Sequence, residues 1–113
     1  MIPYSKHYID KNDIDVVVDV LKNKSITQGE LVHKLEKKIS KYVKSKYAVA
    51  VTSCSAGLHL SSNVLNINNK NVVTSPITFA STASSVLHNK GKLNFVDISR
   101  SNINIDLNKI NDL

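Results

Sequence analysis

The 113-residue sequence is short of several residue types, and each shortage excludes a class of protein. Its single cysteine, Cys54, cannot form an internal disulfide or a multi-cysteine metal site, which fits a reducing cytoplasm. No run approaches the roughly 20 apolar residues that span a bilayer, and the N-terminus lacks the basic and apolar regions of an export signal. We therefore expect a cytoplasmic protein without a membrane segment.

Tryptophan is absent and arginine occurs once, at Arg100, although the net charge is +6. Surfaces that read nucleic acids favour arginine and stacking aromatic side chains. Most lysines between residues 34 and 44 recur at helical spacing beside an apolar stripe, which indicates a solvated helix face. A nucleic-acid partner is therefore not expected, and a basic nucleic-acid module ranks third among the functional hypotheses.

The length and composition of the chain are those of one ordinary domain, because 42% of its 113 residues are hydrophobic, which is enough for a core. After an arm at residues 1–9, apolar periodicity predicts helices at about 12–22, 30–44 and 79–89. Short β-branched runs predict strands at 47–51, 72–75 and 92–98, with Gly91 as a helix cap and the start of a further helix at 107–113. Strands that alternate with helices indicate an α/β fold with a mainly parallel sheet.

The chain is organised around residues 47–60, which read as strand, tight turn and helix. The turn, Thr52-Ser53-Cys54-Ser55, contains only small side chains, so an anion can approach the backbone N–H groups at the start of the helix. The helix dipole adds partial positive charge at the same point. Most strand-to-helix turns carry a serine or threonine cap for purely structural reasons, so the turn alone favours a cap without a ligand and does not identify an anion site.

A second polar turn, at residues 75–78, follows the next predicted strand. Ligands of parallel sheets bind beyond the carboxyl ends of the strands, so the two turns are expected to converge.

Five blocks, in order, resemble a known family over nearly the whole chain. They are Pro3-Tyr4-Ser5, Ile26-Thr27-Gln28-Gly29, residues 52–60 (T-S-C-S-A-G-L-H-L), residues 75–83 (S-P-I-T-F-A-S-T-A), and Phe95-Val96-Asp97-Ile98 with Asn104-Ile105-Asp106. They are similar to motifs of the DegT/DnrJ/EryC1/StrS sugar aminotransferases, which depend on pyridoxal 5′-phosphate (PLP). Within the family, the sequence most resembles transaminases of pseudaminic acid synthesis, which make a UDP-linked altrosamine derivative.

The resemblance implies the N-terminal part of the large domain of a fold-type I PLP-dependent transferase, an α-β-α sandwich. Residues 1–46 would be an arm and two helices, and residues 47–113 the first half of the PLP-binding α/β domain. The abrupt end at Leu113 suggests the opening portion of a longer protein.

The resemblance also implies roles for individual residues. The cofactor phosphate would be held at Cys54 and Ser55, and Phe79 would stack on the pyridine ring. The residues implied in contacts with the nucleotide-sugar or the cofactor adduct are Tyr4, Lys24, Ser25, Ile26, Thr27 and Cys54. L-glutamate is the implied amino donor, and a homodimer is implied because these enzymes are dimers.

Two departures from the family pattern bear on activity. Cys54 replaces a usual glycine or alanine and Ser55 a common threonine, but both remain small. No segment matches the motif of the lysine that attaches the cofactor as a Schiff base, so no catalytic residue is assigned and the 113 residues alone are expected to be inactive. The alternative hypothesis is a non-catalytic remnant, or an anion or nucleotide-sugar binding protein, of the same fold.

Simpler structural roles are preferred for the remaining polar residues. His59 is expected to pack from its helix under the strand rather than to activate Cys54. Asp97 is expected to cap the loop that follows it, and Ser81, Ser84 and Ser85 to allow close helix–sheet packing. The other histidines are scattered without the spacing of metal ligands.

Overall fold

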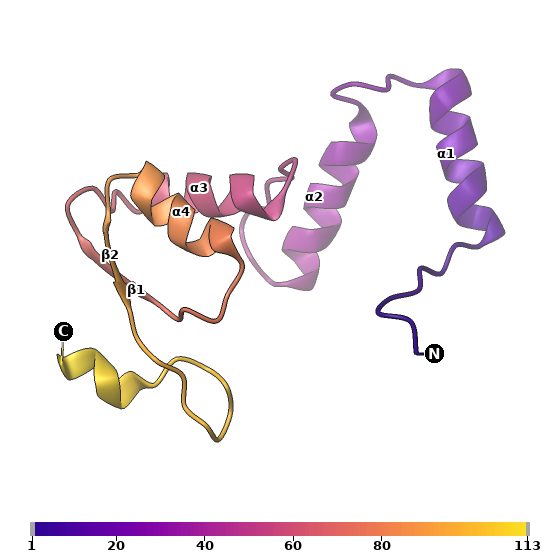
Figure 1. The fold of residues 1–113 in the computed structure, drawn as a ribbon. Coiled ribbons are helices and arrows are strands. Elements are labelled where there is room, and N and C mark those ends of the chain that lie inside the picture. The colour runs from indigo at the N-terminus through magenta and orange to yellow at the C-terminus, as the bar shows by residue number, and fades with distance from the viewer. Residues whose placement is uncertain (1, 113) are drawn as a thin grey trace. The chain divides into compact units, whose positions relative to one another are not determined.

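The computed structural model describes residues 2–112 (Figure 1). The chain forms two compact units, Met1–Ala50 and Val51–Leu113. This boundary lies after Ala50, whereas the sequence suggests a division after Lys46, and the domain division stays a prediction. None of the helices in the described residues is long and apolar enough to cross a membrane.

The first unit contains helix α1, Lys11–Asn23, and helix α2, Glu30–Tyr42, in agreement with the two predicted helices. A capping box begins α1, because Asp10 accepts from the Asp13 N–H while Asp13 accepts from the Asp10 N–H. The loop before α2 turns sharply at Gln28, whose φ is 51°. A Cβ atom on Gly29 would lie 2.5 Å from the Ser25 carbonyl oxygen, so only glycine fits where the loop closes.

The predicted strand at residues 47–51 is wrong, since no ladder hydrogen bond is present there. A strand is stabilised by its neighbours, and neither strand of the described residues pairs with this segment. Two of its apolar side chains are consequently exposed: Tyr47 by 73% and Val49 by 76%. Residues 47–51 are not helical, as the sequence indicates, but they lack the hydrogen-bonded partner that defines a strand.

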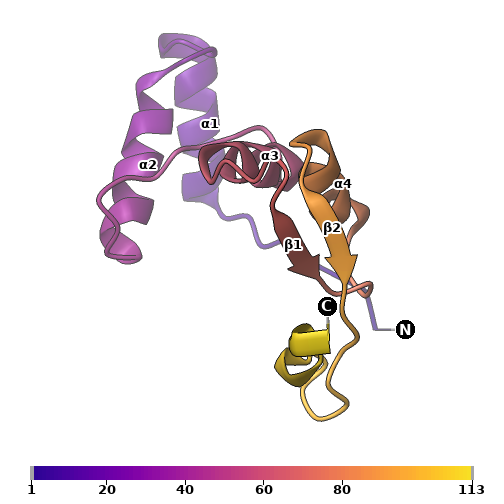
Figure 2. The same ribbon diagram turned by 90° about the vertical axis from the view of Figure 1, so that its left-hand side faces the viewer.

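The second unit has the order α3 (Cys54–Val64), β1 (Asn71–Thr74), α4 (Ala80–His88), β2 (Lys92–Phe95) and the 3-10 helix η1 (Leu107–Asp112). Strands β1 and β2 are parallel, with Asn71 opposite Lys92 and Thr74 opposite Phe95. Helix α4 packs against both strands, and α3 packs against α4 (Figure 2). This confirms the expected strand–helix–strand order and the parallel pairing of the two strands.

Gly91 takes part in the C-terminal cap of α4, as predicted, and also allows close packing. The residue with left-handed backbone is Lys90, with φ 57°, and the Gly91 N–H that follows donates to the Val86 carbonyl oxygen at 2.9 Å. A Cβ on Gly91 would lie 2.7 Å from the Val86 side chain and 3.1 Å from that of Ile67. These two residues and Val96 are the buried apolar side chains of the described residues, so Gly91 lets β2 start directly against this small core.

Strand β2 ends at Phe95, three residues earlier than expected, because Ile98 instead forms an isolated antiparallel bridge with Ile105. Asp97 holds the loop between them as predicted. Its carboxylate accepts from the Ile98 N–H at 2.8 Å and from Lys109 Nζ at 3.2 Å. These contacts, with the backbone bond first, lower the pKa of Asp97.

Candidate functional site

The turn before α3 has the geometry of an anion site. Ser53 is the N-cap, with extended backbone, and its hydroxyl accepts from the Ala56 N–H at 3.1 Å. Its carbonyl accepts from the Gly57 N–H at 3.1 Å. Within residues 2–112, the N–H groups of Cys54 and Ser55 donate to no acceptor. Two exposed donors thus remain at the positive end of the α3 dipole.

Phe79 lies beside this turn. It precedes α4 with an extended backbone, and the residue is 77% exposed. A hollow of about 270 Å³ between α3 and α4 is lined by Ser55 and Phe79 together, with His59, Ser81, Ser84, Ser85 and His88. The structure therefore brings together two of the three residues expected to bind the cofactor. The third, Cys54, is the exposed neighbour of Ser55 on the same turn.

These residues fit a phosphorylated aromatic cofactor such as PLP. The phosphate would accept from the two unpaired N–H groups at Cys54 and Ser55, since small side chains leave the backbone accessible. The exposed Phe79 ring offers an apolar face for a pyridine ring. The donor set and the aromatic face thus match the two ends of the expected ligand.

A polar clamp joins α3 to α4 and positions the walls of this hollow. The Asn89 side-chain nitrogen lies 3.1 Å from His59 Nδ1, 3.2 Å from the His59 carbonyl oxygen and 2.9 Å from the Ser85 carbonyl oxygen. His59 is therefore exposed beside α4, and its ring meets that of His88 edge-on at 6.1 Å. The expectation that His59 packs under a strand is wrong, because its helix packs on α4 instead.

The serines of α4 serve two roles. Ser85 is buried, with its hydroxyl on the Thr82 carbonyl oxygen, as close packing predicts. All three serines also line the hollow, a role that the sequence reasoning missed. Their short sequence distance from Phe79 could have indicated this role, because it places them in the first turns of α4, directly after Phe79.

The predicted sugar-contacting loop belongs to the first unit. Lys24, Ser25 and Ile26 line a hollow of about 470 Å³, which Thr27 and Tyr4 do not line. Ser25 donates to the Thr27 carbonyl oxygen at 2.7 Å, and Tyr4 is fully exposed. Lys24 Nζ lies 2.6 Å from an Asp19 carboxylate oxygen. Hydrogen bonding and charge from Asp19 raise the pKa of Lys24, so this ammonium already has an anionic partner.

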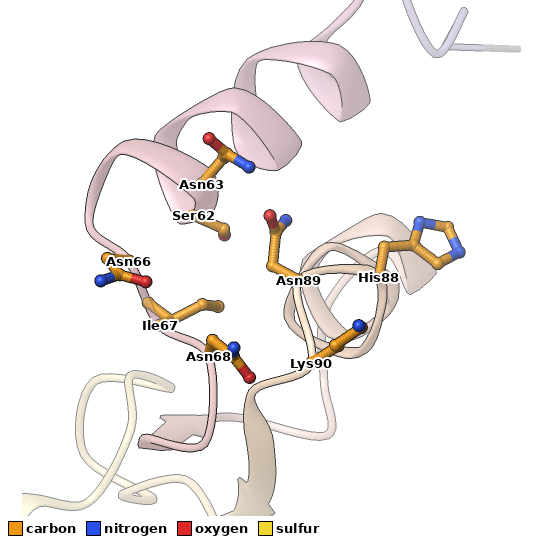
Figure 3. A pocket seen from close by; sticks show the side chains of 8 residues that line it. All are labelled: Ser62, Asn63, Asn66, Ile67, Asn68, His88, Asn89 and Lys90. Atoms are coloured by element: carbon orange, nitrogen blue, oxygen red, sulfur yellow. The ribbon is translucent and has the colours of Figure 1, made fainter.

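A different polar hollow, of about 260 Å³, lies at the C-terminal ends of α3 and α4 (Figure 3). It is lined by Ser62, Asn63, Asn66, Ile67, Asn68, His88, Asn89 and Lys90. Helix C-termini present carbonyl oxygens and partial negative charge, which disfavours a phosphate. Of these two places, the N-terminus of α3 is therefore the candidate anion site.

Comparison with known proteins identifies the family of the chain. The model of the DegT/DnrJ/EryC1/StrS aminotransferase family matches residues 7–113. The chain belongs to this family. The chain is 38% identical over 110 residues to the UDP-4-amino-4,6-dideoxy-N-acetyl-beta-L-altrosamine transaminase of Campylobacter jejuni, with 97% of this chain and 29% of that protein covered.

Solved structures of sugar aminotransferases share the fold. The PLP form of Spr1654 from Streptococcus pneumoniae has a TM-score of 0.89 at 28% identity, covering 98% of this chain and 29% of that one. PseC of Helicobacter pylori, an aminotransferase of pseudaminic acid biosynthesis, has a TM-score of 0.81 at 30% identity, covering 96% and 30%. The α/β arrangement is therefore part of a fold-type I transferase, and the family member described here spans under a third of the length of these relatives.

Proposed function

We propose that this chain supplies the cofactor-phosphate turn of a PLP-dependent aminotransferase. The observation that carries the proposal is the pair of unpaired N–H groups at Cys54 and Ser55, with Ser55 and Phe79 lining one hollow. When bound, PLP supplies the electron sink that lets an amino group leave one substrate and join another. The residues of this chain bind and orient the cofactor and cover one face of its ring.

The proposed reaction moves an amino group from L-glutamate to C4 of a UDP-linked 4-keto-6-deoxy sugar, in pseudaminic acid or related surface-glycan synthesis. The names of the Campylobacter jejuni and Helicobacter pylori relatives support this substrate class. Tyr4, Lys24, Ser25, Ile26 and Thr27 are the proposed sugar-contacting residues, together with Cys54. We propose that the enzyme acts in the cytoplasm as a homodimer, with the residue 24–27 loop reaching the partner subunit's site.

A diphosphate at this loop must compete with Asp19 for the Lys24 ammonium. Both side chains are partly exposed, so the ion pair is screened by solvent and is easily exchanged. This makes Lys24 a mobile cation rather than a fixed one, which suits a ligand that has to be released after each turnover.

The test uses the native gene product, purified from cell extract with an antibody raised to residues 30–46. Its intact mass is measured first, and the product is then incubated with PLP, L-glutamate and the UDP-linked keto sugar. Formation of an amino sugar 1 Da heavier than the keto sugar, with loss of glutamate, supports the proposal. If the purified protein binds PLP but transfers no amino group, the proposed reaction is refuted. That result would favour the alternative of a non-catalytic binding protein with the same anion site. A mass near 12.5 kDa would also withdraw the enzyme activity from this chain.

A further inference from the structure

The side chain of Asn89 connects the two walls of the cofactor hollow, which is the hollow lined by Ser55 and Phe79. One wall belongs to α3 and carries Ser55 and His59, which are four residues apart and therefore share a helix face. The other wall belongs to α4 and carries Ser85, with Phe79 directly before the helix. Asn89 is the C-cap of α4, and its amide contacts both walls.

The contacts of Asn89 decide which way round its amide lies. Its side-chain nitrogen is 2.9 Å from the Ser85 carbonyl oxygen and 3.2 Å from the His59 carbonyl oxygen. Carbonyl oxygens only accept hydrogen bonds, so the –NH₂ group has to face them, because a rotated amide would place its own oxygen against both. The atom that lies 3.1 Å from His59 Nδ1 is therefore a donor.

The same contacts fix the proton of His59. A ring nitrogen that accepts from Asn89 carries no hydrogen, so the neutral ring holds its proton on Nε2. The amide has two hydrogens for three acceptors: the shortest contact, to Ser85, takes one, and Nδ1 shares the other with the His59 carbonyl oxygen. In a protonated His59, Nδ1–H would face –NH₂, donor against donor, and this contact would be lost.

The clamp matters because little else holds α3 on α4. Within residues 2–112, the bonds from Asn89 to His59 are the hydrogen bonds that join α3 to α4 or its cap, and no second pair does so. Helix α3 has no buried residue in the described chain, so its packing on α4 removes little apolar surface from water. The clamp therefore supplies a large part of the connection between the two walls.

We propose that Asn89 is a positioning residue for the cofactor: by holding the neutral form of His59 with its proton on Nε2, it keeps the Ser55 wall against the Phe79 wall. Protonation of His59 loosens this hollow and weakens cofactor binding. The part that concerns the cofactor rests on the proposed function. The proton position of His59 stands on the contacts of the clamp alone.

The proton position is tested by NMR on the native gene product labelled with ¹⁵N at histidine. The His59 signals are those lost in His59→Asn. At a pH where this ring is neutral, we expect hydrogen on Nε2 and none on Nδ1. In Asn89→Asp, whose carboxylate only accepts, the hydrogen should move to Nδ1. Hydrogen on Nδ1 in the unaltered protein, or no movement in Asn89→Asp, overturns the clamp.

Positioning is tested by titrating each variant with PLP after its helix content has been checked by circular dichroism. Asn89→Ala should bind about fivefold more weakly, the effect of one lost hydrogen bond, and Asn89→Asp replaces it if the alanine variant loses helix. Asn63→Ala is the matched control and should bind within about twofold. It removes the same amide from α3, where this side chain makes no hydrogen bond within residues 2–112.

The pH profile separates positioning from a general loss of stability. His59→Asn places an amide oxygen where Nδ1 lies, so it keeps an acceptor for Asn89 that cannot be protonated. The phosphate of PLP titrates as well, so the affinity of the unaltered protein is divided by that of His59→Asn at each pH. This ratio should fall about fivefold as His59 protonates, with the midpoint of its ¹⁵N signals. His88 is the other titratable group that lines the hollow, and Lys90 directly follows Asn89; the fall should persist in His88→Asn.

The outcomes distinguish the clamp, the positioning role and the proposed function. Equal PLP affinity in the unaltered protein and both Asn89 variants, or a ratio that does not change with pH, refutes positioning and leaves the phosphate turn intact. Failure of the unaltered protein to bind PLP refutes the proposed function and positioning together. The ¹⁵N signals of His59 then still decide the clamp.

Discussion

Replacing Cys54 with proline removes one N–H donor from the phosphate turn without disturbing the helix. Cys54 is the first residue of α3, where proline is favoured because its missing N–H has no partner within the helix. Proline also requires an extended residue before it, and Ser53 already has φ −160° and ψ 161°. The substitution therefore meets no backbone conflict at this position.

The expected loss follows from one hydrogen bond to a charged group. Such a bond contributes about 1.5–3 kcal/mol, so Cys54→Pro should weaken phosphate binding by about 10- to 150-fold. Cys54→Ala keeps the N–H and should bind almost like the unaltered chain, which separates the backbone donor from the thiol. Ser53→Ala removes the cap and should destabilise α3 by about 1 kcal/mol while keeping both donors.

The assay is a titration with PLP, followed by phosphorus NMR, with helix content measured by circular dichroism for every variant. The reasoning is refuted if Cys54→Pro retains its helix content and still binds PLP as tightly as Cys54→Ala. In that case the phosphate does not use the Cys54 N–H, and the placement of the cofactor at α3 would be wrong.

Three further predictions concern stability. Gly91→Ala should destabilise the second unit by about 1–3 kcal/mol through overlap with its core, whereas Gly57→Ala, with its nearest contact at 3.5 Å, should not; amide hydrogen exchange of the two variants compares them directly. The stabilising contribution of Asp97 is present above its ordinary pKa and is lost as the pH falls through the lowered value, because the Ile98 N–H and Lys109 hold the ionised form; an acid titration of Lys109 Nζ in Asp97→Asn should lack that step. The isolated 113 residues should show no cooperative thermal transition, since very few apolar side chains are buried; a sharp calorimetric peak would contradict this.

Local signals determined most of the helices. The amphipathic stripes of α1 and α2, and the small capping residues before α3, depend on neighbours within one or two turns, so periodicity and cap chemistry locate these elements. The parallel pairing of β1 with β2 was also predictable, because a helix between two strands leaves few other topologies.

The sequence also located the candidate cofactor site, through the order of its motifs. Cys54 and Ser55 are adjacent along the chain, so their shared place on one turn is local. The meeting of Ser55 with Phe79 required the packing of α3 on α4, which the pattern of small residues in α4 suggests but does not prove.

By itself, the sequence determined most of the helices and the family, and it located the candidate phosphate turn. Tertiary structure alone decided which apolar runs become strands, since residues 47–51 have strand composition but no partner for their ladder. It also decided that His59 is clamped by Asn89, that Gly91 is needed for close packing, and that Glu36 holds the Ala50 N–H. Each of these joins residues far apart in the sequence, and a hydrogen bond or a packing contact at that range leaves no periodic trace in the order of the residues.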